Sequence, residues 1–282
     1  MPRDTPHGAR LLALCAGALI LALIGWPRTN AAAALNFPPS DFDILSADSG
    51  QLIGHGHYRI DQTASTLIMH GENRYLNGEY DIEEDKLTIA DDRPLPMLNS
   101  FRHDFFNADG SPSMASRVDT ETGLGVCAKA VGGKLDLIGE QLKIPEDTYA
   151  GVSVLLPIQQ LVGHGDRSET LKLHVFNCAP TPRLIAVDVK HESGAQSWVG
   201  YPGELEKIDI KANFGFWTVV IQPFTPKLAA WFDPSQDMLL VGAQLQRYYK
   251  GPRIILVRKR EASISNAAAS DRAPAAAGAP PP

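Results

Sequence analysis

The residues best suited to chemistry are His55, His57, His70 and Glu72, which lie where polar and apolar residues alternate. A turn expected at Asp61–Ser65 would place His57 opposite His70. His55 would then lie opposite Glu72, and all four side chains would leave one face of a hairpin. Three imidazoles and a carboxylate are suitable ligands for Zn²⁺ or another divalent transition metal. One hypothesis is therefore a metal-dependent enzyme centred on this face.

The same face also fits a second interpretation, the solvated polar surface of a hairpin that binds no cofactor. Arg59 and Arg74 share the predicted face and would repel a cation. Elsewhere the chain has no Gly-x-Ser-x-Gly, Ser-x-x-Lys or His-Glu-x-x-His motif. We therefore assign no catalytic residue, and we expect a non-enzymatic protein without a cofactor ahead of a metal enzyme.

A short acidic run offers oxygen atoms of the kind that Ca²⁺ prefers: Asp81, Glu83, Glu84 and Asp85. The run lacks the glycine and the spaced ligands of a known calcium loop. The sequence favours the solvated end of a hairpin here.

Aromatic residues gather late in the chain, at Phe214, Phe216, Trp217, Phe224, Trp231 and Phe232. In a curved open sheet, such side chains could line a cavity for an acyl chain or another hydrophobic ligand. In a closed sandwich they would be core. The sequence leaves both interpretations open.

The segment from Arg247 to Arg260 carries six basic residues and no acidic one. Near an anionic membrane surface, each would contribute about 1 kcal/mol of binding energy. Such a segment could make peripheral contact with anionic headgroups. The sequence favours the alternative, a final strand whose exposed ends are charged.

Two cysteines remain if the N-terminal segment that contains Cys15 is removed. In an oxidising compartment, Cys127 and Cys178 could form a disulfide, which would stabilise the chain by about 4 kcal/mol for a loop of this length. They could equally be two buried thiols.

The central part of the chain alternates apolar and polar residues with a period of two, which is typical of strands. Turn pairs interrupt it: Asn77-Gly78, Asp109-Gly110, Gly132-Gly133 and the triplet Glu192-Ser193-Gly194. Strands are expected between these turns, and further ones at 208–212, 216–222, 238–246 and 253–257. The predicted fold is mainly β, with one or more curved antiparallel sheets, either a half-barrel or a β-sandwich.

Two short helices interrupt this pattern. The first is expected at Val152–Val162, where apolar residues recur with helical spacing around Pro157. The second is expected at Thr225–Phe232, because Thr225 can cap a helix that begins with Pro226.

Both ends of the chain have compositions unlike that of a packed domain. Residues 1–34 combine arginines, the apolar run Leu11–Trp26 and an alanine-rich site, as in a secretory signal peptide. The run of 16 residues is short for a membrane span, which needs roughly 20. We expect cleavage near Ala33 or Ala34 and a periplasmic or secreted protein. Residues 35–261 would form the β-rich domain, and 262–282 a disordered tail rich in alanine and proline.

The charge of the chain excludes one class of partner. The formal net charge of −6 becomes −8 without residues 1–34, which carry three basic residues and one acidic residue. Nucleic-acid binding depends on Lys and Arg that displace counterions. We therefore expect no nucleic-acid partner.

The pattern as a whole resembles exported bacterial β-rich families whose curved sheets are similar to the half-barrel of periplasmic lipoprotein carriers. The resemblance rests on the signal peptide, the Gly-x-Tyr-x-Ile run at Gly56–Ile60, the hairpin at Tyr75–Gly78 and the late Gly251-Pro252. It implies a concave sheet and no known catalytic residue. The leading prediction is a non-enzymatic envelope protein that binds or carries a hydrophobic ligand or envelope partner, ahead of the metal enzyme and of a purely structural envelope component.

Overall fold

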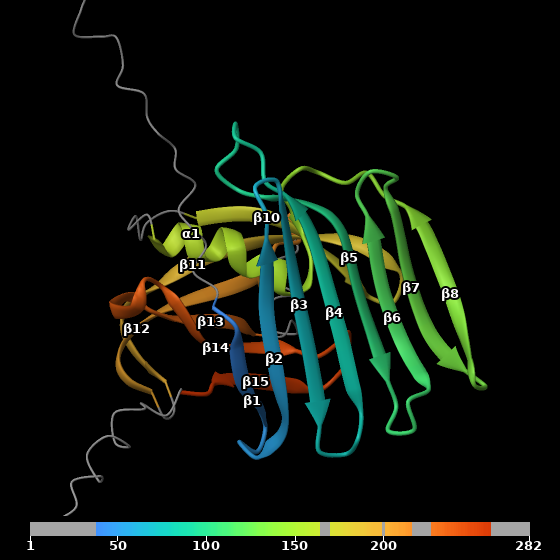
Figure 1. Ribbon diagram of the computed structural model, residues 1–282, viewed down its shortest axis with the longest axis horizontal. Coiled ribbons are helices and arrows are strands. Elements are labelled where there is room, and N and C mark those ends of the chain that lie inside the picture. Colours follow the sequence, from blue (N-terminus) through green and yellow to red (C-terminus); the bar gives the residue numbers. More distant parts are fainter. Residues whose placement is uncertain (1–37, 164–169, 199–200, 216–226, 261–282) are drawn as a thin grey trace, which may run out of the picture. The chain divides into compact units, whose positions relative to one another are not determined.

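The computed structural model describes residues 38–163, 170–198, 201–215 and 227–260 (Figure 1). Within them, strands form a single 15-stranded sheet in the order β8-β7-β6-β5-β4-β3-β2-β1-β15-β14-β13-β12-β11-β10-β9. The strands are β1 (Ser40–Ser46), β2 (Leu52–Gln62), β3 (Thr66–Tyr75), β4 (Tyr80–Thr88), β5 (Met97–Phe106), β6 (Pro112–Asp119), β7 (Leu124–Val131), β8 (Lys134–Gln141), β9 (Thr148–Tyr149), β10 (Thr170–Cys178), β11 (Pro182–Trp198), β12 (Tyr201–Ala212), β13 (Leu228–Asp233), β14 (Leu239–Gln246) and β15 (Arg253–Arg258).

Tight turns explain why β1 to β8 follow one another across the sheet. Gly78, Gly110, Gly132 and Gly133 all have positive φ, which glycine adopts without steric cost. Each of these turns joins two antiparallel strands, as predicted. The curved, mainly antiparallel β fold expected from the sequence is confirmed, and it is one continuous sheet rather than a sandwich.

One predicted turn is wrong. Glu192-Ser193-Gly194 does not end a strand, because β11 continues to Trp198 and stays paired with β12. The register shifts between Glu192 and Gln196, so the extra residues are absorbed as an irregularity within the strand.

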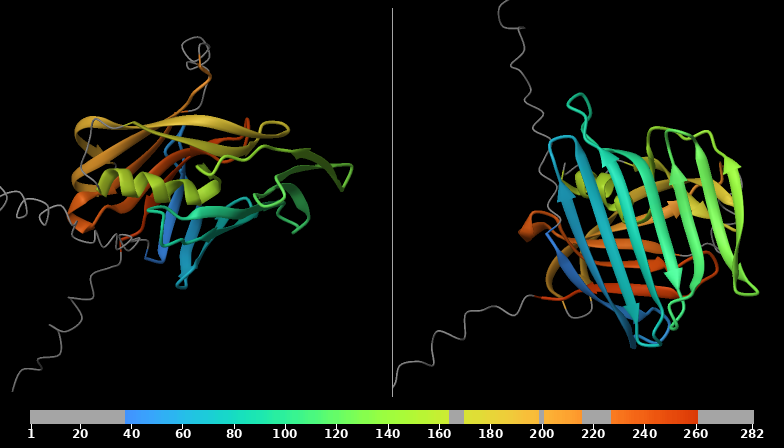
Figure 2. Two further views of the ribbon diagram at one scale, coloured as in Figure 1. Left: turned by 90° about the horizontal axis from the view of Figure 1, so that it is seen from above. Right: turned by 45° about the vertical axis from the view of Figure 1, so that its right-hand side comes forward.

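The sheet curls around a shared hydrophobic core (Figure 2). A 3₁₀ helix, η1 (Gly151–Val154), leads into the helix α1 (Leu155–Gly163), which lies between the N-terminal and the C-terminal strands of the sheet. Leu156 and Ile158 of α1 are fully buried. The helix predicted at Val152–Val162 is confirmed, and Pro157 fits because it lies in the first turn, where no helical N–H bond is lost.

The second predicted helix, Thr225–Phe232, is wrong over the part that is described. Leu228–Asp233 forms β13, while Thr225 and Pro226 lie outside the described residues. This strand is buried on both faces, so its residues form a continuous apolar run that periodicity cannot tell from a helix. A further short 3₁₀ helix, η4 (Pro234–Gln236), follows it.

A disulfide between Cys127 and Cys178 ties the two ends of the sheet together. Cys127 lies on β7 and Cys178 ends β10, and each of these strands is second from one end of the sheet. The two ends pack closely here: a Cβ on Gly125 would lie 2.9 Å from Pro182 Cβ and 3.1 Å from the Phe176 ring. A covalent bond and packing therefore bring the ends of the curled sheet together, and none of the described strands pair across them.

Among the residues described, no helix has the length and apolar character required to cross a membrane.

Candidate ligand-binding cavity

The concave side of the sheet encloses an open cavity of about 2090 Å³. Typical small-molecule sites occupy roughly 300–1,000 Å³, so this space is large enough for a bulky ligand. Most strands of the sheet contribute to its wall, and its apolar part includes residues of β5, β10, β11, β12, β14 and β15. The apolar residues include Phe101, Phe176, Val187, Ile210, Leu245 and Ile254.

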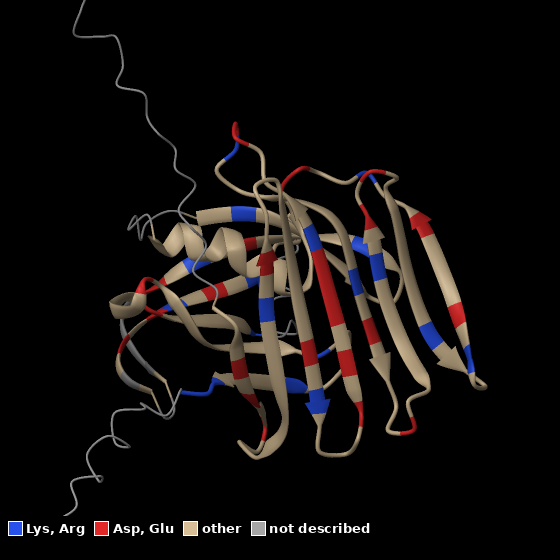
Figure 3. Cartoon of the chain, in the orientation of Figure 1, with Lys and Arg blue, Asp and Glu red and all other residues tan. Residues whose placement is uncertain are grey.

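One part of the wall is polar, because β4 presents acidic side chains to the interior. Asp81, Glu83 and Asp85 are buried, whereas Ile82 between them is 45% exposed. Figure 3 shows the resulting acidic run along β4. The sequence-based expectation of a solvated hairpin end is therefore wrong for three of the four acidic residues, since the strand is oriented with its carboxylates inward.

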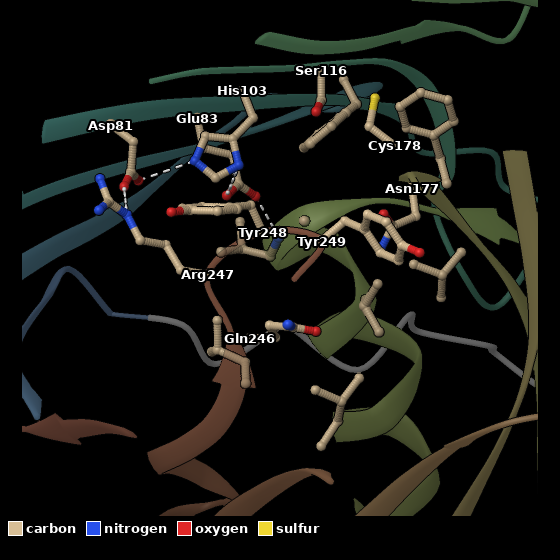
Figure 4. Close-up of a pocket in the computed structure, with 18 of the residues that line it drawn as sticks. Asp81, Glu83, His103, Ser116, Asn177, Cys178, Gln246, Arg247, Tyr248 and Tyr249 are labelled. Atoms are coloured by element: carbon tan, nitrogen blue, oxygen red, sulfur yellow. Dashed lines mark hydrogen bonds and ion pairs between the residues drawn. The ribbon is translucent and has the colours of Figure 1, made fainter. Parts of the chain in front are cut away.

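His103 on β5 lies between two of these carboxylates (Figure 4). Its Nε2 is 3.0 Å from Asp81 Oδ1, and its Nδ1 is 3.6 Å from Glu83 Oε2. Burial lowers the pKa of His103, but the two carboxylates raise it more, and the net direction is upward. The imidazole is therefore expected to be cationic over a wider pH range than a free histidine.

Arg247 reaches the same group from the far side of the cavity. Its Nη1 lies 2.6 Å from Glu79 Oε2, and its Nε lies 3.4 Å from Asp81 Oδ2. The guanidinium carbon is 3.7 Å from the centre of the Tyr75 ring, and only 8% of the side chain is exposed. Burial raises the pKa of Asp81. The hydrogen bonds from His103 and Asn73 and the charge of Arg247 lower it by more, so the net shift is downward.

The other two inward carboxylates of β4 hold the start of the helical segment. Val152 N–H donates to Glu83 Oε1 at 2.5 Å, and Ser153 N–H donates to Asp85 Oδ2 at 2.7 Å. Amides at the start of a helix lack partners within the helix, so acceptors on a neighbouring strand satisfy them. These bonds connect β4 to η1 and so fix where α1 begins.

Because Glu83 and Asp85 are buried, their pKa values are raised above the ordinary 4.5 and 3.8. Between the ordinary and the raised values, the folded chain keeps protons that the unfolded chain has released. The free energy of unfolding therefore falls as pH rises through this window. His103, whose pKa is raised above 6.5, acts in the same direction at higher pH.

Asp85→Asn is expected to flatten this pH dependence. Asparagine keeps an oxygen that can accept the Ser153 N–H but does not ionise, so the variant should lose less stability than the wild type as pH rises above the ordinary carboxyl range. A series of urea unfolding curves over that rise in pH measures the effect. Glu204→Gln, at an exposed carboxylate of β12 that is not among the charges acting on Asp85, is the control and should keep the wild-type profile. Equal pH profiles for Asp85→Asn and wild type would contradict the prediction.

The histidine hairpin lies away from this polar wall, and its predicted pairing is wrong. His57 lies opposite Glu72 rather than His70, which instead lies opposite Arg59. The turn begins at Thr63 rather than Asp61, and Thr63 and Thr66 close it with a backbone hydrogen bond of 2.8 Å. The partner opposite each residue of β2 therefore shifts by two, which preserves the face, so the histidines still share one side of the sheet.

On that face each imidazole has its own carboxylate. His55 Nδ1 is 2.9 Å from Asp43 Oδ1, and His57 Nδ1 is 2.8 Å from Asp41 Oδ1. His70 Nε2 is 3.1 Å from Asp61 Oδ2. Within the described part of the chain, no three His, Cys, Asp or Glu side chains are placed to hold a metal ion. The geometry therefore gives no support to a metal centre at His55, His57, His70 and Glu72.

The predicted aromatic group is divided by the fold. Trp231 and Phe232 are consecutive residues of β13 and point to opposite faces, with Phe232 in the main core and Trp231 in a small outer cluster. Phe214 is 37% exposed and lines the cavity. The remaining three lie outside the described residues: Phe216, Trp217 and Phe224.

The basic segment is also divided. Arg247 points inward, as described above, while Arg253 pairs with Asp48 and Lys259 pairs with Asp43 at 3.1 Å. Arg258 Nη1 donates to the carbonyl oxygen of Leu240. Several of these basic side chains thus already form ion pairs or hydrogen bonds within the chain.

Sequence reasoning did not select His103 or Arg247 for the interior. The sequence of β4 did carry a signal that its acidic residues point inward. Asp81, Glu83 and Asp85 share one face of the strand, and the apolar Ile82 lies on the opposite face, the reverse of the usual arrangement. Arg247 lies in a loop, and no periodic pattern indicates the direction of a loop side chain.

The fold and the cavity define a class of protein: an open, barrel-like antiparallel sheet that surrounds a large, mostly apolar space with one polar wall. No protein-family model matches the chain, and no curated protein sequence is significantly similar to it. Among solved structures, it is similar to the crystal structure of a beta-barrel-like protein of domain of unknown function DUF1849 from Brucella abortus. The TM-score is 0.46 at 10% sequence identity, over 79% of this chain and 95% of that chain.

Proposed function

We propose that this chain is a non-enzymatic protein of the cell envelope that binds a hydrophobic or amphiphilic molecule on the concave side of its sheet. The observation that carries this proposal is the cavity of about 2090 Å³ with its largely apolar wall. Burial of apolar ligand surface contributes about 25 cal/mol per Å², so a long or branched apolar body would be held strongly.

The polar wall supports a ligand with one polar end. The basic side chains of His103 and Arg247 are held in place by Asp81, Glu79 and Glu83, so their positions are set before a ligand enters. Such fixed groups orient a ligand at little entropic cost. Because each of the two basic side chains already has an acidic partner, a neutral or zwitterionic polar end fits this wall better than a strongly charged one.

Ile210→Trp tests whether the cavity is the binding site. Ile210 is a partly buried residue of β12 that lines the cavity, and the larger indole should occupy space that a ligand needs. We expect native mass spectrometry of protein purified from its export compartment to show a bound organic molecule. Its occupancy should fall at least about tenfold in the variant, which corresponds to a loss of about 1.4 kcal/mol.

The matched control places the same side chain on the other face of the same strand. Lys211 is exposed and forms a surface ion pair with Asp209, so Lys211→Trp should retain wild-type occupancy. Equal occupancy in the two variants, or wild-type protein that carries nothing, would contradict binding in the cavity.

Export is part of the proposal and has its own test. N-terminal sequencing of the protein made in its host should return a chain that begins near Ala34 or Leu35. A chain that begins at Met1 or Pro2 would contradict it.

A further inference from the structure

The strand β8 lies at one end of the sheet, and its outer edge pairs with none of the described strands. Leu137 and Ile138, on its two faces, are 65% and 41% exposed. Natural proteins normally protect such edges, because unpaired backbone groups can bind another strand. An exposed strand edge of eight residues is therefore expected to bind another strand.

The backbone groups that face outward can be deduced from the turn. Gly132 and Gly133 form a two-residue turn between Val131 and Lys134, which pair with each other. Residues that flank such a turn exchange both hydrogen bonds, and hydrogen-bonded and non-hydrogen-bonded pairs then alternate along the strands. The odd-numbered residues of β8 accordingly direct their N–H and C=O groups toward the free edge.

This requirement leaves three central registers for antiparallel pairing of β8 with the β8 of a second copy. If the pairing is centred on Asp136, the two copies of Asp136 face each other; if it is centred on Ile138, Asp136 of each copy faces Glu140 of the other. If it is centred on Leu137, Lys134 of each copy faces Glu140 of the other, and the two Leu137 side chains meet. Like charges directly opposite destabilise a sheet, whereas opposite charges stabilise it. The register centred on Leu137 is thus favoured by charge.

The charged side chains of β8 are free to pair with a second copy of the strand. Lys134, Asp136 and Glu140 are exposed, and none of them forms an ion pair with another described residue. A two-fold axis through Leu137 would satisfy Lys134 and Glu140 of both copies at once, as an isologous interface requires.

We propose that a second copy of this chain binds along β8, antiparallel and centred on Leu137, so that the two sheets become continuous. The interface is self-complementary through its backbone, through two Lys134–Glu140 pairs and through the exposed Leu137 side chains.

The test is a charge exchange. Sedimentation velocity and light scattering of the full mature chain at about 50 µM should give a dimer for the wild type. Lys134→Glu turns two attractive pairs into two repulsive ones and should raise the dissociation constant at least tenfold, by an order-of-magnitude estimate. The double variant K134E/E140K restores opposite charges in the same register and should recover the dimer.

Lys86→Glu is the control, because Lys86 is an exposed residue of β4 in the interior of the sheet order, and it should dimerise like the wild type. A monomeric wild type would overturn the proposal, as would a Lys134→Glu variant that still dimerises. A double variant that stays monomeric would overturn the register.

Discussion

Replacing Arg247 with methionine is expected to lower the free energy of unfolding by about 3–5 kcal/mol, the usual cost of removing one partner from a buried ion pair. Asp81 would lose its contact at 3.4 Å and Glu79 its contact at 2.6 Å. Methionine has a similar length, so the effect should reflect the lost charge and the lost contact with Tyr75 more than a cavity. Urea unfolding measures it.

Arg253→Met provides the matched control. Arg253 also pairs with an aspartate, Asp48, but their side chains are 48% and 69% exposed. Exposed pairs contribute about 0–1 kcal/mol, so this variant should stay near wild-type stability.

The double variant R247M/D81N sharpens the test. Because the second change removes one of the two carboxylates that lose their contact with Arg247 in the first, the two losses should not add. An Arg247→Met loss no larger than that of Arg253→Met would contradict the interpretation of a buried pair.

The second large effect is expected from the disulfide. The double variant C127S/C178S should lose about 4 kcal/mol, because the bond spans 51 residues and restricts the unfolded chain accordingly. The folded state should change as well, since Cys127 and Cys178 join strands that are not paired with each other. Hydrogen exchange of β7, β8 and β10 should accelerate more than that of β2 and β3.

Reduction of the wild-type protein is the companion measurement, and it should give the same loss without any substitution. An unchanged unfolding midpoint in both experiments would contradict a stabilising role for the bond. Accelerated exchange spread evenly over all strands would contradict its specific role in closing the sheet.

The sequence predicted the hairpins well, because turn chemistry is local. Asn77-Gly78 and Gly132-Gly133 require positive φ whatever surrounds them, and the adjacent strands follow from that requirement. The helix at Val152–Val162 was predictable for the same reason, from apolar residues with local helical spacing.

The site was harder to predict, because it depends on contacts between distant segments. A polar residue in an alternating strand is normally assigned to solvent, yet Asp81 and Glu83 point inward, where His103, Arg247 and the amides of η1 compensate their burial. These partners come from other strands and loops, and no local pattern identifies them. The predicted pairing of the histidine hairpin was wrong by a smaller amount, because its turn starts at Thr63 instead of Asp61.

The order of strands has a consequence for how the chain is made. β1, the first described strand, pairs with β15, the last, and this pair joins the two halves of the sheet. During synthesis, β1 to β8 emerge first, and the edge of β1 that faces β15 stays unpaired until nearly the whole chain has followed. The pairing of β1 with β15 is therefore the last step in completing the sheet, and a half-sheet with an exposed strand edge precedes it.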